Sequence, residues 1–214
     1  MKILIITDSL GLPRNEPQKV DLEKTWPYLI QQEFKDGIVV QMSLGGATIG
    51  DLFNQISYYR AFAPDVVIVQ SGIVDCAPRA FKKGELEIMQ RLPLFNRFIL
   101  PLVKKRTHLI RNKRNISYTN PALFSNLVNG FIKEFGKEKL YWIGIIPAVE
   151  AYEKKLPGIT NAITNYNKII QNILGNHYID TLGIPKEGIM PDFHHLNNIG
   201  NRYVFDQVLK KLER

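Results

Sequence analysis

Two short segments near opposite ends of the chain carry the residue types that acyl transfer needs. Ser9 follows a short apolar run at residues 3–6, and the sequence Asp-Phe-His-His occupies residues 192–195, just before the last expected helix. A serine hydroxyl becomes a nucleophile when a base takes its proton, and a third group must hold that base in one tautomer. Ser9, His195 and Asp192 are therefore candidates for the nucleophile, the general base and the orienting carboxylate.

The spacing of Asp192 and His195 suits the last two roles. In a tight turn, side chains three positions apart lie on the same side, so we expect the Asp192 carboxylate to accept the Nδ1 proton of His195. The Nε2 atom would then face Ser9. A second interpretation stays open at this point, because paired histidines before a helix also occur as polar loop residues and an aspartate also caps local turns.

Apolar segments predict the elements that position these residues. We expect strands over residues 2–6, 38–42, 66–70, 140–146 and around 178, and helices over residues 22–33, 49–61, 161–174 and 199–212. Buried strands that alternate with helices indicate a parallel sheet covered on both faces. The prediction is an α/β fold, a three-layer α/β/α sandwich with a mainly parallel, flavodoxin-like five-stranded sheet. Ligands bind at the carboxyl ends of such strands, which is where Ser9 lies.

Four short segments, in order along the chain, resemble the four sequence blocks of the SGNH (GDSL-type) hydrolases. Thr-Asp-Ser-Leu at residues 7–10 resembles the GDSL block, with threonine in place of the usual glycine. Residues 43–48 resemble the second block, residues 72–75 the third, and residues 192–197 the closing block. The resemblance implies a serine-dependent carboxylic ester hydrolase, an esterase or deacetylase, with acylated carbohydrates among its substrates.

The resemblance also implies an oxyanion hole built from the backbone N–H groups of Ser9 and Gly46. Val74 departs from the family pattern, since it stands where the third block has an asparagine donor. Loss of one such donor slows acyl transfer by about 10²- to 10³-fold. Val74 therefore leaves open a non-catalytic binding module on a decayed hydrolase scaffold. An O-acyltransferase with the same triad is a second alternative, if a sugar hydroxyl rather than water takes the acyl group.

Four residues near these blocks are candidate substrate contacts: Asp8, Val74, Arg79 and His194. Arg79 follows the third strand onto the same edge as Ser9, and a guanidinium suits paired hydrogen bonds to a carboxylate or phosphate. An ion pair of Arg79 with Asp75 or Glu85 that merely fixes the loop is the alternative. His194 also fits the pattern of an exposed loop residue.

Composition favours one catalytic domain over residues 1–214 without a metal or cofactor. The 214 residues are 45% hydrophobic, enough for a core of their own, and the single cysteine, Cys76, excludes an internal disulfide. Residues 45–50 do not form the GxGxxG pattern of dinucleotide sites. Because the chain lacks a signal-peptide pattern and a long apolar span, we expect a cytoplasmic protein.

Residues 91–120 break the alternation of strands and helices and are expected to form a basic and apolar insertion. Their lysines and arginines contribute much of the formal net charge of +8. A solvated loop with an apolar underside, a cover over the active-site cleft and peripheral membrane contact through residues 91–114 are three open interpretations. No nucleic-acid-binding motif accompanies the charge. We therefore expect a small-molecule or glycan ester as the partner, and no nucleic acid.

Overall fold

A computed structural model describes residues 1–82, 84–85, 88, 110–111, 114 and 116–213. Its centre is a parallel sheet whose strands are β1 (Lys2–Thr7), β2 (Ile38–Ser43), β3 (Val66–Gln70), β4 (Leu140–Ile143) and β5 (Tyr178–Ile179). The strand order is β2-β1-β3-β4-β5, so the direction of winding reverses beside β1. In doubly wound sheets this switch point opens the ligand crevice at the carboxyl ends of the strands.

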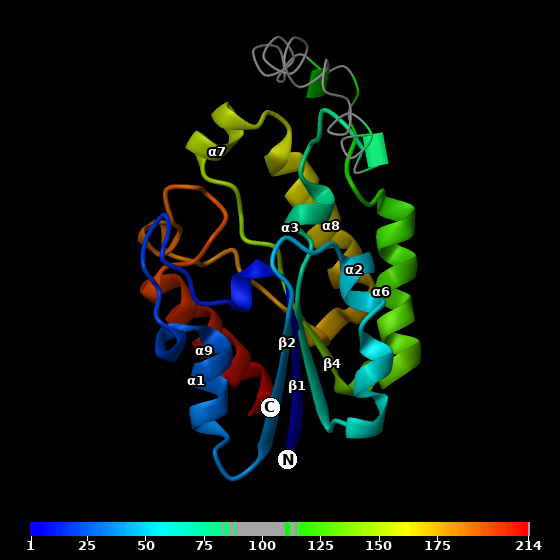
Figure 1. Cartoon of the computed structure of the whole chain (residues 1–214), viewed down its shortest axis with the longest axis vertical. Helices are drawn as coiled ribbons and strands as arrows, with labels where there is room; N and C mark the ends of the chain where they lie inside the picture. The colour runs from blue at the N-terminus through cyan, green and yellow to red at the C-terminus, as the bar shows by residue number, and fades with distance from the viewer. Residues whose placement is uncertain (83, 86–87, 89–109, 112–113, 115, 214) are drawn as a thin grey trace.

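Helices cover both faces of the sheet, which confirms the predicted α/β/α sandwich (Figure 1). The helix α1 (Trp26–Glu33) packs against α9 (Asn198–Leu212) on one face. On the other face, α6 (Pro121–Phe135) packs against α2 (Ile49–Phe53) and α8 (Ile159–Leu174). Two short helices, α3 (Ile73–Cys76) and α7 (Glu150–Lys155), lie beyond the carboxyl ends of the strands (Figure 1).

Several predicted boundaries are wrong for identifiable reasons. The strand expected over 140–146 ends at Ile143, because the Asn167 side chain bonds both backbone groups of Ile145, at 2.8 Å and 2.9 Å. The helix expected over 22–33 begins at Trp26, with Pro27 in its first turn, where a missing amide proton is tolerated. The helix expected over 49–61 ends at Phe53, and a 3₁₀ segment, Ile56–Phe62, follows.

The helix α6 was not predicted, although its sequence carries the signals of a buried helix. Asn120 caps it by accepting a hydrogen bond from the Leu123 amide at 2.9 Å, and Pro121 occupies its first turn. Four of its apolar residues recur at spacings of three and four and are buried: Phe124, Val128, Phe131 and Phe135. The pattern was not recognised because the helix begins directly after the irregular segment 91–120.

The expected insertion at residues 91–120 lies largely outside the described residues, and so do its interpretations as a membrane contact or a cleft cover. The described residues of this segment contact residues 79–85, which follow α3. Ile116 pairs with Arg79 through an isolated antiparallel bridge, and Arg114 pairs with Glu85 at 2.7 Å. Within the described ranges, no helix is long and apolar enough to span a bilayer.

Candidate active site

Ser9 lies where β1 leaves the sheet. The Asp8 amide donates to the Gln70 carbonyl at 3.1 Å, which continues the pairing of β1 with β3 for one residue. A 3₁₀ turn, η1 (Ser9–Gly11), then begins, and the Asp8 side chain caps it by accepting a hydrogen bond from the Leu10 amide at 2.9 Å. The turn therefore presents the Ser9 hydroxyl, in a half-buried position, at the carboxyl edge of the sheet.

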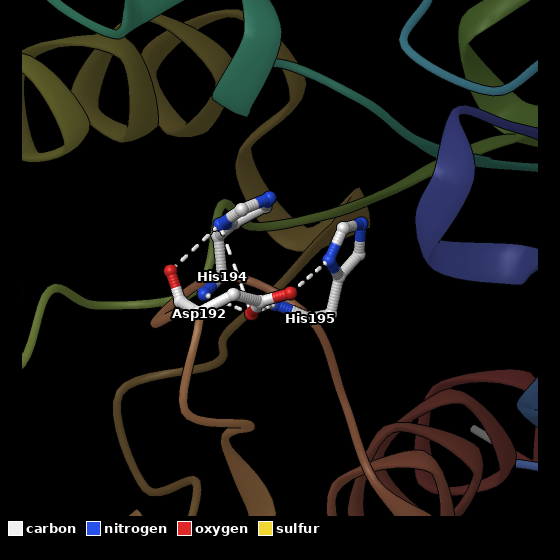
Figure 2. Close-up of side chains that lie close together, drawn as sticks. All are labelled: Asp192, His194 and His195. Carbon is white, nitrogen blue, oxygen red and sulfur yellow. Dashed lines mark hydrogen bonds and ion pairs between the residues drawn. The ribbon is translucent and has the colours of Figure 1, made fainter. Parts of the chain in front are cut away.

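The structure brings Ser9, His195 and Asp192 together across almost the whole length of the chain. The Ser9 Oγ lies 2.9 Å from the His195 Nε2, and the His195 Nδ1 lies 2.6 Å from the Asp192 Oδ2. The second carboxylate oxygen accepts the His195 amide at 3.1 Å and the His194 amide at 3.2 Å (Figure 2). This arrangement can move a proton from the Ser9 hydroxyl to an imidazole whose orientation a carboxylate fixes.

Backbone hydrogen bonds hold the turn that carries His195. The Met190 amide donates to the His195 carbonyl at 2.8 Å, and Ile189 pairs with Leu196 in an antiparallel bridge. Phe193 has a φ of 76°, in the left-handed region that a bulky side chain seldom adopts. The strained Phe193 backbone closes the turn that directs Asp192 toward the His195 ring.

Electrostatics in this cluster favours a neutral imidazole beside an ionised carboxylate. Burial lowers the pKa of His195 to about 4, and the nearby His194 and Arg14 act in the same direction, while the hydrogen bond to Asp192 opposes them. Burial alone would raise the pKa of Asp192, but hydrogen bonds from His195 outweigh it and leave that pKa below its usual value. At neutral pH His195 is therefore a free base, ready to accept a proton.

Arg14 belongs to this site, although the sequence analysis missed it. Its Nη2 donates to the Ser9 carbonyl at 2.6 Å, and its charge acts on Asp8, Asp192 and His195. Two backbone hydrogen bonds with Val20, at 3.0 Å and 2.8 Å, close the loop that carries it. The only signal in the sequence was a basic residue five positions after the serine.

Asp8 does not contact the substrate side of the site, which corrects the predicted role. The residue is fully buried. Its Oδ1 accepts the Leu10 amide, and its Oδ2 has no hydrogen-bond partner in the described part of the chain. Asp8 therefore caps the turn that carries Ser9.

An Asp8→Asn variant should gain stability relative to the wild type as pH rises. Burial raises the pKa of Asp8 to about 7, so between about pH 4 and 7 the unfolded chain releases this proton while the folded chain keeps it. The contribution of Asp8 to the free energy of unfolding consequently falls by up to about 1.4 kcal/mol per pH unit over that window. Asparagine cannot ionise, so its contribution to the free energy of unfolding does not fall over this pH window.

Urea unfolding of both proteins at pH 4.5 and pH 8 measures this difference. The free energy of unfolding of Asp8→Asn minus that of the wild type should be larger at pH 8. A difference that is the same at both pH values would show that Asp8 is already ionised in the folded protein.

Gly46 lies on a turn next to the carboxyl ends of β1 and β2. The turn begins where the Leu44 amide donates to the Thr7 carbonyl at 3.0 Å, and Gly46 is exposed with a φ of 69°. Asp75 fixes the far end of the turn, because its buried carboxylate accepts the Ile49 amide at 3.0 Å and the Thr119 hydroxyl. The third sequence block thus holds the second in place, and Asp75 is a positioning residue that the sequence analysis did not assign to the site.

Val74 and Arg79 lie together after β3. Val74 is half-buried in α3, and its carbonyl accepts a hydrogen bond from the Arg79 Nη2 at 3.3 Å. Neither of the two ion pairs considered for Arg79 forms, since Asp75 binds Ile49 and Thr119, and Glu85 pairs with Arg114. The Arg79 guanidinium lies instead over the Tyr118 ring, 4.4 Å from its centroid.

His194 has a defined position beside the catalytic candidates. Its Nδ1 lies 3.0 Å from the Asp192 carbonyl oxygen, and its ring lies 4.1 Å from that of His195 and 6.1 Å from that of Tyr152. Both histidine rings project to the same side of the loop (Figure 2). His194 is therefore a wall of the site rather than a freely exposed loop residue.

A metal ion would compete with the hydrogen bonds already described. Among the described residues, Asp192, His194 and His195 place one ligand atom each within 4.8 Å of one another. The Asp192 Oδ2 and the His195 Nδ1 are engaged with each other at 2.6 Å, however. The geometry suits proton transfer, and the expectation of no metal and no cofactor stays a prediction.

The fold is shared with solved hydrolases of low sequence identity, whereas no family model and no curated protein matches the sequence. A lipase/acylhydrolase from Enterococcus faecalis aligns with 99% of this chain over 95% of its own, at a TM-score of 0.68 and 16% identity. The acetyl xylan esterase AlAXEase aligns with 98% of this chain over 98% of its own, at a TM-score of 0.63 and 17% identity. A lipolytic protein of the G-D-S-L family from Veillonella parvula aligns with 100% of this chain over 98% of its own, at a TM-score of 0.58 and 13% identity. The chain has the fold of the GDSL-type, or SGNH, hydrolases.

Proposed function

We propose that this protein is a serine-dependent carboxylic ester hydrolase in which Ser9 is the nucleophile. The observation that carries the proposal is the continuous hydrogen-bonded series from the Ser9 Oγ through His195 to Asp192, with distances of 2.9 Å and 2.6 Å. The series lies at the carboxyl edge of a parallel sheet, where such folds bind ligands. The shared fold with lipases and esterases agrees with this chemistry.

In the proposed reaction the Ser9 Oγ attacks the ester carbonyl while the His195 Nε2 takes the hydroxyl proton. Asp192 stabilises the imidazolium, and the N–H groups of Ser9 and Gly46 stabilise the oxyanion. Collapse of the tetrahedral intermediate breaks the bond to the alcohol, which leaves with the proton from His195. Water then attacks the acyl-enzyme by the same route and releases the acid.

For the substrate we propose a small acyl ester or an acetylated glycan. Acetyl xylan esterase structures among the neighbours support an acetylated carbohydrate, although at identities of 14% and 17% they share only the fold. An added sugar hydroxyl that replaces water in the second step would give acyl transfer with the same residues.

The competing function is a binding module that has lost catalysis, and Val74 favours it. An isopropyl group cannot donate a hydrogen bond, so the proposed oxyanion hole has two backbone donors and lacks the third, side-chain donor of the family pattern. Such a loss typically slows the reaction by about 10²- to 10³-fold without abolishing it. We therefore favour a slow hydrolase over an inert scaffold.

A panel of esters tests the proposal. It should contain 4-nitrophenyl acetate, 4-nitrophenyl butyrate, triacetin and acetylated xylo-oligosaccharides, with release of acid or alcohol as the readout. We expect saturable hydrolysis of short acyl esters above the uncatalysed rate. No release from any member at high protein concentration would favour the binding module.

A further inference from the structure

The backbone of Phe193 is held in an unfavourable conformation two residues before the proposed general base. Its φ of 76° lies in the left-handed region, which a bulky side chain keeps only where the surrounding structure enforces it. Hydrogen bonds of the turn supply part of this enforcement, because the Phe193 amide donates to the Met190 carbonyl at 2.8 Å. The side chains of the turn have a second source of support, which comes from another element.

That element is α7, which lies beside the loop at the carboxyl end of the sheet (Figure 1). Tyr152 of α7 is buried, and its ring stacks on the Phe193 ring with the centroids 5.8 Å apart. Three residues further along α7, the Lys155 ammonium lies 5.2 Å from the centroid of the same ring. Both distances fall in the range of favourable aromatic and cation–π contacts, so α7 holds Phe193 by its side chain.

The Tyr152 ring also supports His195 through His194. Its centroid lies 6.1 Å from that of the His194 ring, with 23° between the two planes. The His194 ring in turn lies 4.1 Å from the His195 ring. The three rings therefore form a series of packing contacts that ends at the imidazole whose Nε2 lies 2.9 Å from the Ser9 Oγ.

The helix α7 is itself fixed to the start of α8. The Glu153 carboxylate accepts the Gly158 amide at 2.6 Å and the Thr160 amide at 2.9 Å. Just after α7, Leu156 is buried, and its amide donates to the Tyr152 carbonyl at 2.7 Å. Tyr152 thus lies on an anchored element, as the precise placement of a catalytic group requires.

We propose that Tyr152 is a positioning residue of the active site. Through its contacts with Phe193 and His194, it holds the ring of the general base in place for proton transfer from Ser9. The inference rests on the proposed function and deepens it, because it adds a residue that acts on the base through the base's neighbours. A displacement of about 1 Å at a catalytic group can cost about 10²-fold in rate, so loss of the supporting ring should be visible in turnover.

Ester hydrolysis by three variants at position 152 tests the proposal. Tyr152→Phe keeps the ring and should therefore keep kcat within about twofold of the wild type. Tyr152→Ala and Tyr152→Leu remove the stacked ring. Each should lower kcat for 4-nitrophenyl acetate by at least about tenfold and change KM by less than about threefold, because the base is misplaced while the substrate still binds. Tyr152→Leu keeps apolar volume and serves if the alanine variant fails to fold.

Tyr141→Ala is the matched control, because Tyr141 makes the same kind of contact at the other end of the sheet. Its ring lies 4.7 Å from that of His177, which precedes the amino end of β5. This control should keep the kcat of the wild type. The proposal is overturned if Tyr152→Leu keeps wild-type kcat, if Tyr141→Ala loses as much kcat as Tyr152→Ala, or if Tyr152→Phe loses as much as either ring-deleting variant.

Proton NMR gives a readout that needs no hydrolysis. The His195 Nδ1 lies 2.6 Å from the Asp192 Oδ2, and a proton in so short a bond to a carboxylate should give a downfield signal, assigned by its absence in His195→Gln. The signal should persist in Tyr152→Phe and Tyr141→Ala and broaden or vanish in Tyr152→Ala.

The NMR result also separates this inference from the proposed function. An unchanged signal in a folded Tyr152→Ala protein would overturn the positioning role. A wild type that hydrolyses no ester, but whose downfield signal depends on the Tyr152 ring, would contradict the proposed function alone.

Discussion

Replacing Ser9 with alanine should reduce the turnover of every ester that the wild type hydrolyses by at least about 10⁴-fold. The substitution removes one oxygen atom, and the contact that it removes is the 2.9 Å hydrogen bond to the His195 Nε2. The backbone N–H of residue 9 and the loop around it remain. Initial rates at saturating 4-nitrophenyl acetate, with stability checked by thermal unfolding, measure the effect.

Ser117→Ala is a suitable control, because the Ser117 hydroxyl bonds to Tyr166 at 3.1 Å rather than to any catalytic candidate. Its turnover should stay within about twofold of the wild type. A Ser9→Ala protein that keeps more than a hundredth of wild-type turnover would assign the hydrolysis to another nucleophile.

Replacing Asp192 with asparagine should cost about 10⁴-fold in kcat. The Asp192 Oδ2 lies 2.6 Å from the His195 Nδ1, and only an acceptor there keeps the proton on Nδ1. An amide nitrogen at the same place is a donor, so the ring proton moves to Nε2, which then cannot take the proton of Ser9. The backbone amides of His194 and His195 can still bond the remaining carbonyl oxygen, which preserves the turn.

Asp206→Asn controls for the loss of a carboxylate at an exposed ion pair, and it should leave kcat unchanged. Because the turn is retained, Asp192→Asn should lose far more activity than stability. A loss of kcat below about tenfold would mean that Asp192 shapes the turn without orienting the base.

Strand positions and the contact between Asp192 and His195 could be predicted from sequence because each rests on a local signal. Residues 3–6 are an uninterrupted apolar run, and all four are fully buried in β1. Because Ser9 follows this run in the sequence, it must lie at the carboxyl end of β1. The spacing of Asp192 and His195 sets their mutual contact, which needs only one tight turn.

Other parts of the site depend on contacts that no local pattern encodes. The burial of Asp8 follows from the way η1 folds back over β1, and an acidic residue beside a candidate serine gave no sign of it. Arg14 reaches the Ser9 carbonyl because its loop closes through Val20. Tyr152 meets His194 across the two loops that follow β4 and β5. These are tertiary pairings, and a single sequence gives no measure of them.

At Val74 the sequence departs from the family pattern, which has an asparagine donor at this position. The isopropyl group of Val74 offers no side-chain donor, and the gap in the oxyanion hole stays a prediction. The backbone at this position keeps a role, however, since the Val74 carbonyl positions Arg79.

The most direct test is covalent labelling with a fluorophosphonate, followed by peptide mapping of the modified residue. This reagent reacts with serine hydroxyls that an adjacent base has activated, and it needs no knowledge of the natural ester. We predict stoichiometric phosphonylation at Ser9, lost in Ser9→Ala and strongly slowed in Asp192→Asn. A folded wild-type protein that stays unlabelled, or that is labelled at another serine, would contradict the assignment of Ser9 as an activated nucleophile.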